Sequence, residues 1–235
     1  MRRALPIVFL LLLAGCGGQK TAETTPLLTQ APTTTAAALP LARQVLVVYG
    51  AGNGKLVAGR VLVPQTRAVG RAALAALGLS VGSLVLSNGT ATVSLDPEPE
   101  GVDLARVVFT LTEFRSVRRV SLGGRTLTRA DMEEFAPPIL VVSPQPGDTA
   151  ASPLRVHGTA DTFEATFMVD VVDGAGTVLV ERTVTATSGS GQRGTFDETI
   201  PFTGAKPGGG KLVAFESSAE NGERIHVVEI PLVFG

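Results

Sequence analysis

The residue with the most distinctive chemistry is Cys16, the only cysteine among 235 residues. It follows a start with two arginines, an almost purely apolar run over residues 4–13, and the small residues Ala14 and Gly15. An apolar run of about ten residues is too short to span a bilayer, which takes roughly 20, but it is typical of a secretory signal. A lone thiol in an exported chain has no partner for an internal disulfide, so acylation is a use that fits it.

The segment Leu13-Ala14-Gly15-Cys16 resembles the lipobox of bacterial lipoproteins, in which the peptidase cuts before the cysteine and the thiol carries lipid. The resemblance implies a signal peptide over residues 1–15 and a lipid anchor on Cys16, on the extracytoplasmic side of the cell membrane. Stable anchoring takes more than one acyl chain, and the diacylglycerol plus amide-linked chain of such lipoproteins supplies it. The alternatives are an ordinary cleaved signal with an incidental cysteine, and a short uncleaved anchor.

The other residue types that could do chemistry form no recognisable catalytic, metal or cofactor site. Two isolated histidines, His157 and His226, cannot supply a structural zinc site without cysteines, and we expect them to be solvated or locally hydrogen-bonded. The Gly-rich segment over residues 50–55 lacks the third glycine of a dinucleotide fingerprint and the Ser or Thr of a P-loop, so it predicts a hairpin turn. No G-x-S-x-G elbow is present, and close carboxylate pairs such as Glu133 and Glu134 are typical of a solvated surface. We therefore expect a protein that is not an enzyme.

One dense basic cluster stands out: Arg115, Arg118, Arg119 and Arg125. Arginine binds carboxylate and phosphate bidentately, so the cluster predicts a contact for an acidic partner or the anionic envelope. The alternative is ordinary surface charge beside a hairpin. Strand alternation separates Arg118 from Arg119, so only some of the four could share a face.

Composition divides the chain into a tether and two folded parts. Residues 16–43 are rich in Thr, Ala, Gln and Pro and should stay disordered. Residues 44–136 and 138–235 are predicted to be separate domains that meet at Pro137-Pro138. Residues 43–136 hold 11 Lys and Arg against 8 Asp and Glu, and residues 137–235 hold 6 against 12. Neither half is basic enough to suggest nucleic acid.

The first part mixes strand and helix patterns and predicts a small α+β domain. Strands are expected over residues 45–49, 56–63 and 91–95, helices over 64–77 and 101–114, a hairpin over 117–127 and a short helix over 131–135. The phrase FTLTEF (109–114) followed by VRRVSLGGRTL (117–127) resembles the sporulation and germination GerMN domain. The sequence departs from that family between Leu77 and Val85, where a loop and a strand of the family are missing.

The second part alternates apolar and polar residues over seven runs, which predicts a β-sandwich. The runs are 139–143, 153–158, 166–172, 177–186, 195–201, 211–217 and 225–234. Without a disulfide or tryptophan it cannot have an antibody-type core. Phrases such as GTFDETIPF (194–202) resemble the immunoglobulin-like domain of bacterial spore germination. In that resemblance Phe163 and Glu164 form a recurrent pair, for which packing and a turn contact are expected before ligand binding.

These inferences predict a lipid-anchored, non-enzymatic scaffold or binding module at the cell envelope. The partners implied are the membrane through the lipid, and envelope proteins or peptidoglycan, with sheet edges as contact surfaces. A solute-binding or sensor-accessory lipoprotein is the second candidate and would need one deep, mostly apolar pocket. A cell-wall hydrolase is the third and would solubilise peptidoglycan.

Overall fold

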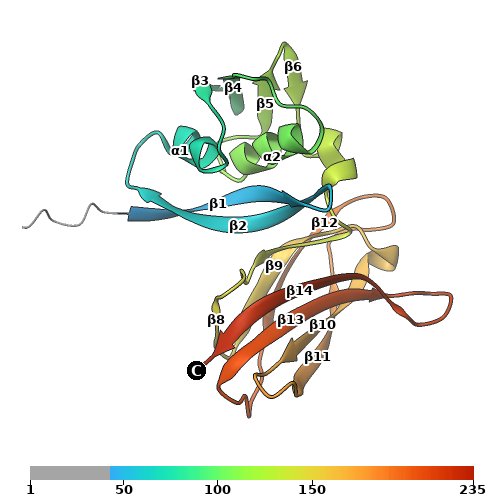
Figure 1. The fold of residues 1–235 in the computed structure, drawn as a ribbon. Coiled ribbons are helices and arrows are strands. Elements are labelled where there is room, and N and C mark those ends of the chain that lie inside the picture. The colour runs from blue at the N-terminus through green and yellow to red at the C-terminus, as the bar shows by residue number, and fades with distance from the viewer. Residues whose placement is uncertain (1–42) are drawn as a thin grey trace, which may run out of the picture. The chain divides into compact units, whose positions relative to one another are not determined.

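A computed structural model describes residues 43–235, which fall into one compact unit. The predicted signal peptide, Cys16 and nearly all of the predicted tether lie outside the described residues. Within residues 43–235, none of the helices is both long and apolar enough to cross a membrane. The fold is an α+β part followed by a β-sandwich, which confirms the predicted fold class (Figure 1).

The first part opens with a two-stranded hairpin, β1 (Arg43–Gly52) and β2 (Lys55–Pro64). Its turn residues Asn53 and Gly54 both have positive φ, 51° and 73°. Two successive positive φ values define the type I′ turn that joins antiparallel strands with their natural twist. The glycine-rich segment is therefore a hairpin turn, as predicted.

Two helices follow the apolar periodicity of the sequence. α1 (Val69–Ala76) buries Ala73 and Leu74. In α2 (Gly101–Thr112), every residue from 104 to 111 is buried except Arg106. α1 is shorter than the predicted helix over residues 64–77, because β2 extends through Pro64, which pairs with Arg43. α2 begins and ends close to its predicted bounds.

A four-stranded sheet in the order β3-β4-β5-β6 completes this part. Its strands are β3 (Val81–Ser87), β4 (Thr90–Leu95), β5 (Arg119–Leu122) and β6 (Arg125–Leu127), and a 3₁₀ segment, η1 (Ala130–Phe135), follows them. Figure 1 shows α1 and α2 between this sheet and the β1–β2 hairpin. Their apolar residues form two clusters with the inward faces of the β layers, a large one around α2 and a small one between α1 and the hairpin.

The second part contains all seven predicted strands and a two-residue strand, β8, that was not predicted. They are β7 (Ile139–Ser143), β8 (Thr149–Ala150), β9 (Leu154–Ala160), β10 (Thr166–Val172), β11 (Val178–Thr185), β12 (Gly194–Ile200), β13 (Gly208–Ser217) and β14 (Arg224–Phe234). One sheet has the order β11-β10-β13-β14-β8 and the other β12-β9-β7. A separate apolar cluster fills the space between the sheets, with Phe167 and Phe196 in edge-to-face contact at 4.9 Å between ring centroids.

Candidate functional site

The four arginines predicted to bind a partner do not converge on one surface. The backbone N–H groups of Arg118 and Arg119 both donate to the carbonyl of Gly89, at 2.7 and 3.1 Å. Since Val120 is buried, strand alternation directs the Arg119 side chain to the opposite face of β5. Arg125 lies 3.8 Å from a carboxylate oxygen of Glu98.

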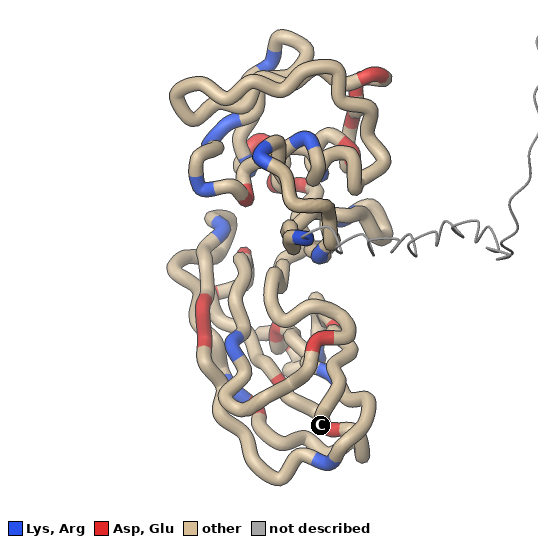
Figure 2. The backbone as a smooth tube through the Cα atoms, turned by 90° about the vertical axis from the view of Figure 1, so that its left-hand side faces the viewer, with Lys and Arg blue, Asp and Glu red and all other residues tan. Residues whose placement is uncertain are grey.

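Arg115 and Arg118 are exposed and stand on either side of Ser116 and Val117 in the chain. Among the described residues, neither arginine takes part in an ion pair. The structure therefore divides the predicted cluster into one pair beside residues 116–117 and two separate arginines. Figure 2 shows that charges of both signs occur in both parts of the chain.

The phrase FTLTEF builds a polar network inside the first part, which sequence patterns did not predict. Thr110 Oγ1 accepts a hydrogen bond from the backbone N–H of Tyr49 at 3.0 Å. Glu113 accepts one from the Tyr49 hydroxyl at 2.9 Å and one from Arg129 at 2.7 Å. Burial raises the pKa of Tyr49 far above its usual range, so the phenol is a hydrogen-bond donor at neutral pH. These hydrogen bonds connect β1, α2 and Arg129.

The two histidines lie apart, as expected. His157 is half-buried on β9, and its pKa is lowered by burial and by the neighbouring charge of Arg155. The Nδ1 atom of His226 lies 2.9 Å from a carboxylate oxygen of Glu216. Within residues 43–235, no three His, Cys, Asp or Glu side chains are grouped so that they could hold a metal ion.

An unusual loop in the sandwich joins β9 to β10. We call residues 162–166, which include the 3₁₀ segment η2 (Phe163–Ala165), the Phe163 loop. The side chain of Phe163 is 59% exposed, which corrects the expectation that it packs. Glu164 and Ala165 have φ of 52° and 58°, a left-handed backbone that L-residues rarely adopt. This backbone reversal lets the chain enter β10 while Phe163 stays outside the core.

Backbone strain is concentrated around this loop. Six non-glycine residues of the described chain have positive φ, and two of them, Asn53 and Asn88, are explained by hairpin turns. The other four gather here: Glu164, Ala165, Ser190 and His226. Each costs of order 1–3 kcal/mol, and such strain concentrates at functional sites.

Hydrogen bonds to neighbouring segments hold the Phe163 loop in place. Glu216, only 7% exposed, accepts a hydrogen bond from the backbone N–H of Phe163 at 2.8 Å and contacts His226 with its other oxygen. The backbone N–H of Glu164 donates to Ser190 Oγ at 3.1 Å. The predicted turn contact is therefore present. The loop is a fixed platform that presents an aromatic ring to solvent.

Two apolar side chains of β14 are exposed as well. Ile225 and Val227 flank His226 on β14 and are 37% and 48% exposed. Positive φ at His226 interrupts the alternation of β14, and the β13–β14 register shifts between Ala214 and Glu216. An exposed aromatic ring on a fixed loop suits the recognition of another molecule better than it suits catalysis. From the sequence, only the family phrase around Phe163 marked this place.

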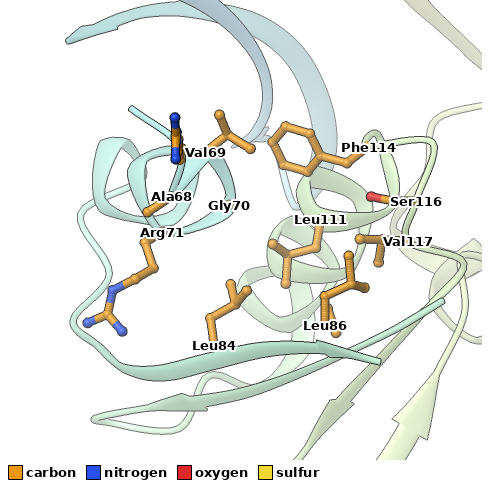
Figure 3. Close-up of a pocket in the computed structure, with 12 residues that line it drawn as sticks. Ala68, Val69, Gly70, Arg71, Leu84, Leu86, Leu111, Phe114, Ser116 and Val117 are labelled. Carbon is orange, nitrogen blue, oxygen red and sulfur yellow. The ribbon is translucent and has the colours of Figure 1, made fainter. Parts of the chain in front are cut away.

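A hollow lies in the first part, between α1, β3 and the chain after α2. Figure 3 shows Leu84 and Leu86 of β3 pointing toward Leu111, with Phe114 and Val69 facing them. The cavity is about 310 Å³, near the lower limit of small-molecule sites. We call it the β3 groove. Its charged lining residues are both basic, Arg67 and Arg71.

Comparison with known families identifies the sandwich. Residues 138–223 match the model of the immunoglobulin-like domain of bacterial spore germination. The matched range begins with the predicted second domain and includes the Phe163 loop and most of the strands of the sandwich. The resemblance seen in the sequence of this part is thereby confirmed.

Other comparisons add little. No curated protein matches the chain. A solved structure of the tandem GerMN domains of the sporulation protein GerM from Bacillus subtilis aligns at 12% identity and a TM-score of 0.33. The alignment covers 68% of this chain and 62% of that one, so this chain spans less than two thirds of the solved structure. A TM-score this low carries no argument about fold or function.

Proposed function

We propose that the protein is a lipid-anchored lipoprotein on the extracytoplasmic side of the membrane, and that it acts there as a non-enzymatic scaffold or binding module. Its role is of the sporulation- and germination-associated type, and its partners are envelope proteins or peptidoglycan. Anchoring rests on the sequence around Cys16. The binding role rests on the sandwich.

The observation that carries the proposal is the exposed ring of Phe163 on a strained, hydrogen-bonded loop. The free energy falls when a partner covers a large aromatic side chain that is exposed to water. Aromatic residues also dominate binding hot spots. Because the loop is already fixed by Glu216 and Ser190, little conformational entropy is lost on binding. In immunoglobulin variable domains, the loops at one end of the sandwich bind the partner.

The family match supports a germination-related role without catalysis. The immunoglobulin-like domain of spore germination is not known as an enzyme family, and it accounts for residues 138–223. We assign the first part to the GerMN type from its sequence phrases alone, because the structural alignment is too weak to add weight.

The second candidate, a solute-binding lipoprotein, gains one observation from the structure. The β3 groove is mostly apolar, as such a site requires, although its volume of about 310 Å³ is small. We prefer the scaffold because the groove is small and the Phe163 loop presents a built contact surface. A cell-wall hydrolase predicts that purified protein clears peptidoglycan, and we expect none to be solubilised.

The proposal is tested by photo-crosslinking in intact cells that produce the protein, with a photoreactive phenylalanine analogue at position 163. The matched control places the same analogue at Val178, which is 52% exposed on the edge strand β11. We expect a specific adduct from position 163 and none from 178. Phe163→Ala should abolish a partner's co-purification and change the free energy of unfolding by less than about 0.5 kcal/mol. Equal labelling from both positions would contradict the proposal.

A further inference from the structure

The outer edge of β3 is open to another strand. β3 is the terminal strand of its sheet and pairs only with β4, through a turn in which Asn88 and Gly89 have φ of 48° and 76°. In a two-residue hairpin of this type, the residues that flank the turn form a hydrogen-bonded pair and pairs alternate from there. Leu86 and Leu84 therefore belong to non-hydrogen-bonded pairs, and their N–H and C=O groups point away from β4.

The same two leucines line the β3 groove. Leu86 is paired with Ala91 and Leu84 with Val93, both buried on the helix side of the sheet. The leucine side chains consequently point into the groove (Figure 3). Their backbone N–H and C=O groups point outward from the open edge of the sheet. Leu86 is 46% exposed. A strand added at this edge would place every second side chain over the groove.

One end of the edge is closed by Arg71. Its guanidinium donates to the carbonyls of Val81 and Gly82, at 2.6 and 3.2 Å. Covering an edge with a charged side chain is a common protection against unwanted pairing. Here the protection stops at residue 82, so the open length is Ser83–Ser87.

The charge around the groove is basic. Arg67 and Arg71 line it, and Arg115 and Arg118 flank its lining residues Ser116 and Val117. The lining contains no Asp or Glu. Peptides that carry carboxylates beside apolar side chains would therefore be favoured over basic ones.

From these observations we infer that β3 captures an extended acidic peptide segment of another protein. The segment adds to the sheet as a fifth strand and puts alternate apolar side chains into the β3 groove. The carboxylates that flank this apolar stretch at its ends lie near the arginines. This site is distinct from the Phe163 loop and does not depend on membrane anchoring. Purified protein is therefore sufficient for its test.

The test measures binding of two fluorescein-labelled peptides by fluorescence anisotropy. Both alternate leucine with threonine over six residues, and one is flanked by two glutamates at each end whereas the other is flanked by two lysines. We expect the acidic peptide to bind at least tenfold more tightly than the basic one, and to weaken as salt is raised. Leu86→Thr should weaken binding about tenfold. Val85→Thr, on the other face of the same strand, should change it less than twofold. Equal effects of the two substitutions would overturn the inference.

Two further experiments test separately the charge of the groove and the backbone hydrogen bonds at the sheet edge. Arg67→Glu should weaken binding of the acidic peptide about tenfold, whereas Arg182→Glu, the same charge change on the sandwich strand β11, should not. N-methylation of the peptide on alternate residues should abolish binding in one phase of the alternation and spare it in the other, as edge pairing requires. Failure of both peptides to bind, or binding of dodecanoate but of neither peptide, would also overturn it. The second result would point to an anionic amphiphile as the occupant.

Discussion

The phenolic hydroxyl of Tyr49 on β1 donates a hydrogen bond of 2.9 Å to the carboxylate of Glu113, at the end of α2. Arg129 donates to the same carboxylate oxygen at 2.7 Å, and its guanidinium carbon lies 4.9 Å from the ring centroid of Phe109. One network thus joins the first strand, the long helix and the segment before η1. It explains why FTLTEF carries polar residues within an otherwise apolar stretch.

This network predicts unequal effects of its members on stability. Tyr49→Phe removes one neutral donor and should lower the free energy of unfolding by about 1 kcal/mol. Arg129→Met leaves Glu113 without its charge partner and should cost about 2–3 kcal/mol. Urea unfolding measures both, and Arg115→Met, an exposed arginine, is the control that should change stability by less than about 0.5 kcal/mol. Equal losses in the Arg129 and Arg115 variants would show that the network contributes nothing.

A second prediction concerns Gly158 in β9, the middle strand of the three-stranded sheet. A Cβ at this position would collide with the carbonyl oxygen of Leu140 and the ring of Phe196. Gly158→Ala should therefore lower the free energy of unfolding by about 1–3 kcal/mol, the usual cost of overpacking. At Gly209 on β13 a Cβ meets open space, so Gly209→Ala should have little effect. Melting temperatures measure both effects, and a Gly158→Ala variant that melts at the same temperature as the parent protein would show that the prediction is wrong.

The pH dependence of stability should involve His157. Burial and the nearby Arg155 lower its pKa below the ordinary value of 6.5, so the folded state favours the neutral imidazole. As the pH falls through 6.5, the unfolded chain binds a proton before the folded chain does, and the free energy of unfolding falls. The stability that the lowered pKa of His157 contributes is fully present above pH 6.5 and is lost as the pH falls below it. His157→Gln should therefore lose less stability than the parent between pH 7.5 and 5.5, and an identical loss would exclude this role.

Much of the fold could be predicted because its elements follow simple periodicities. The seven sandwich strands alternate, and α2 carries apolar residues at helical spacing. β3 could not be predicted, since Gly82 and a register shift between Val81 and Ser83 break the alternation. Val85 and Leu86, on opposite faces of this edge strand, are both exposed and both apolar, so no polar face contrasts with the inward one. β8 has two residues, too few for any pattern.

The candidate sites were harder to predict than the fold. The arginine cluster was visible in the sequence, which also predicts that strand alternation separates Arg118 from Arg119. The approach of Arg125 to Glu98 depends on tertiary contacts that no local pattern encodes. The expectation that Phe163 packs was wrong, because the left-handed backbone at Glu164 and Ala165 is decided by tertiary hydrogen bonds to Glu216 and Ser190. No local pattern encodes those contacts.

The proposed function depends on the claim that a lipid attached to Cys16 anchors the folded residues outside the cell. Mass spectrometry of the N-terminal peptide of protein purified from membranes tests it directly. We predict a mature chain that begins at Cys16 and carries the added mass of a diacylglyceryl group and an amide-linked acyl chain, and a Cys16→Ser variant that is released from membranes without fatty-acid label. A chain that begins elsewhere, or an unmodified Cys16 in cytosolic protein, would contradict the account.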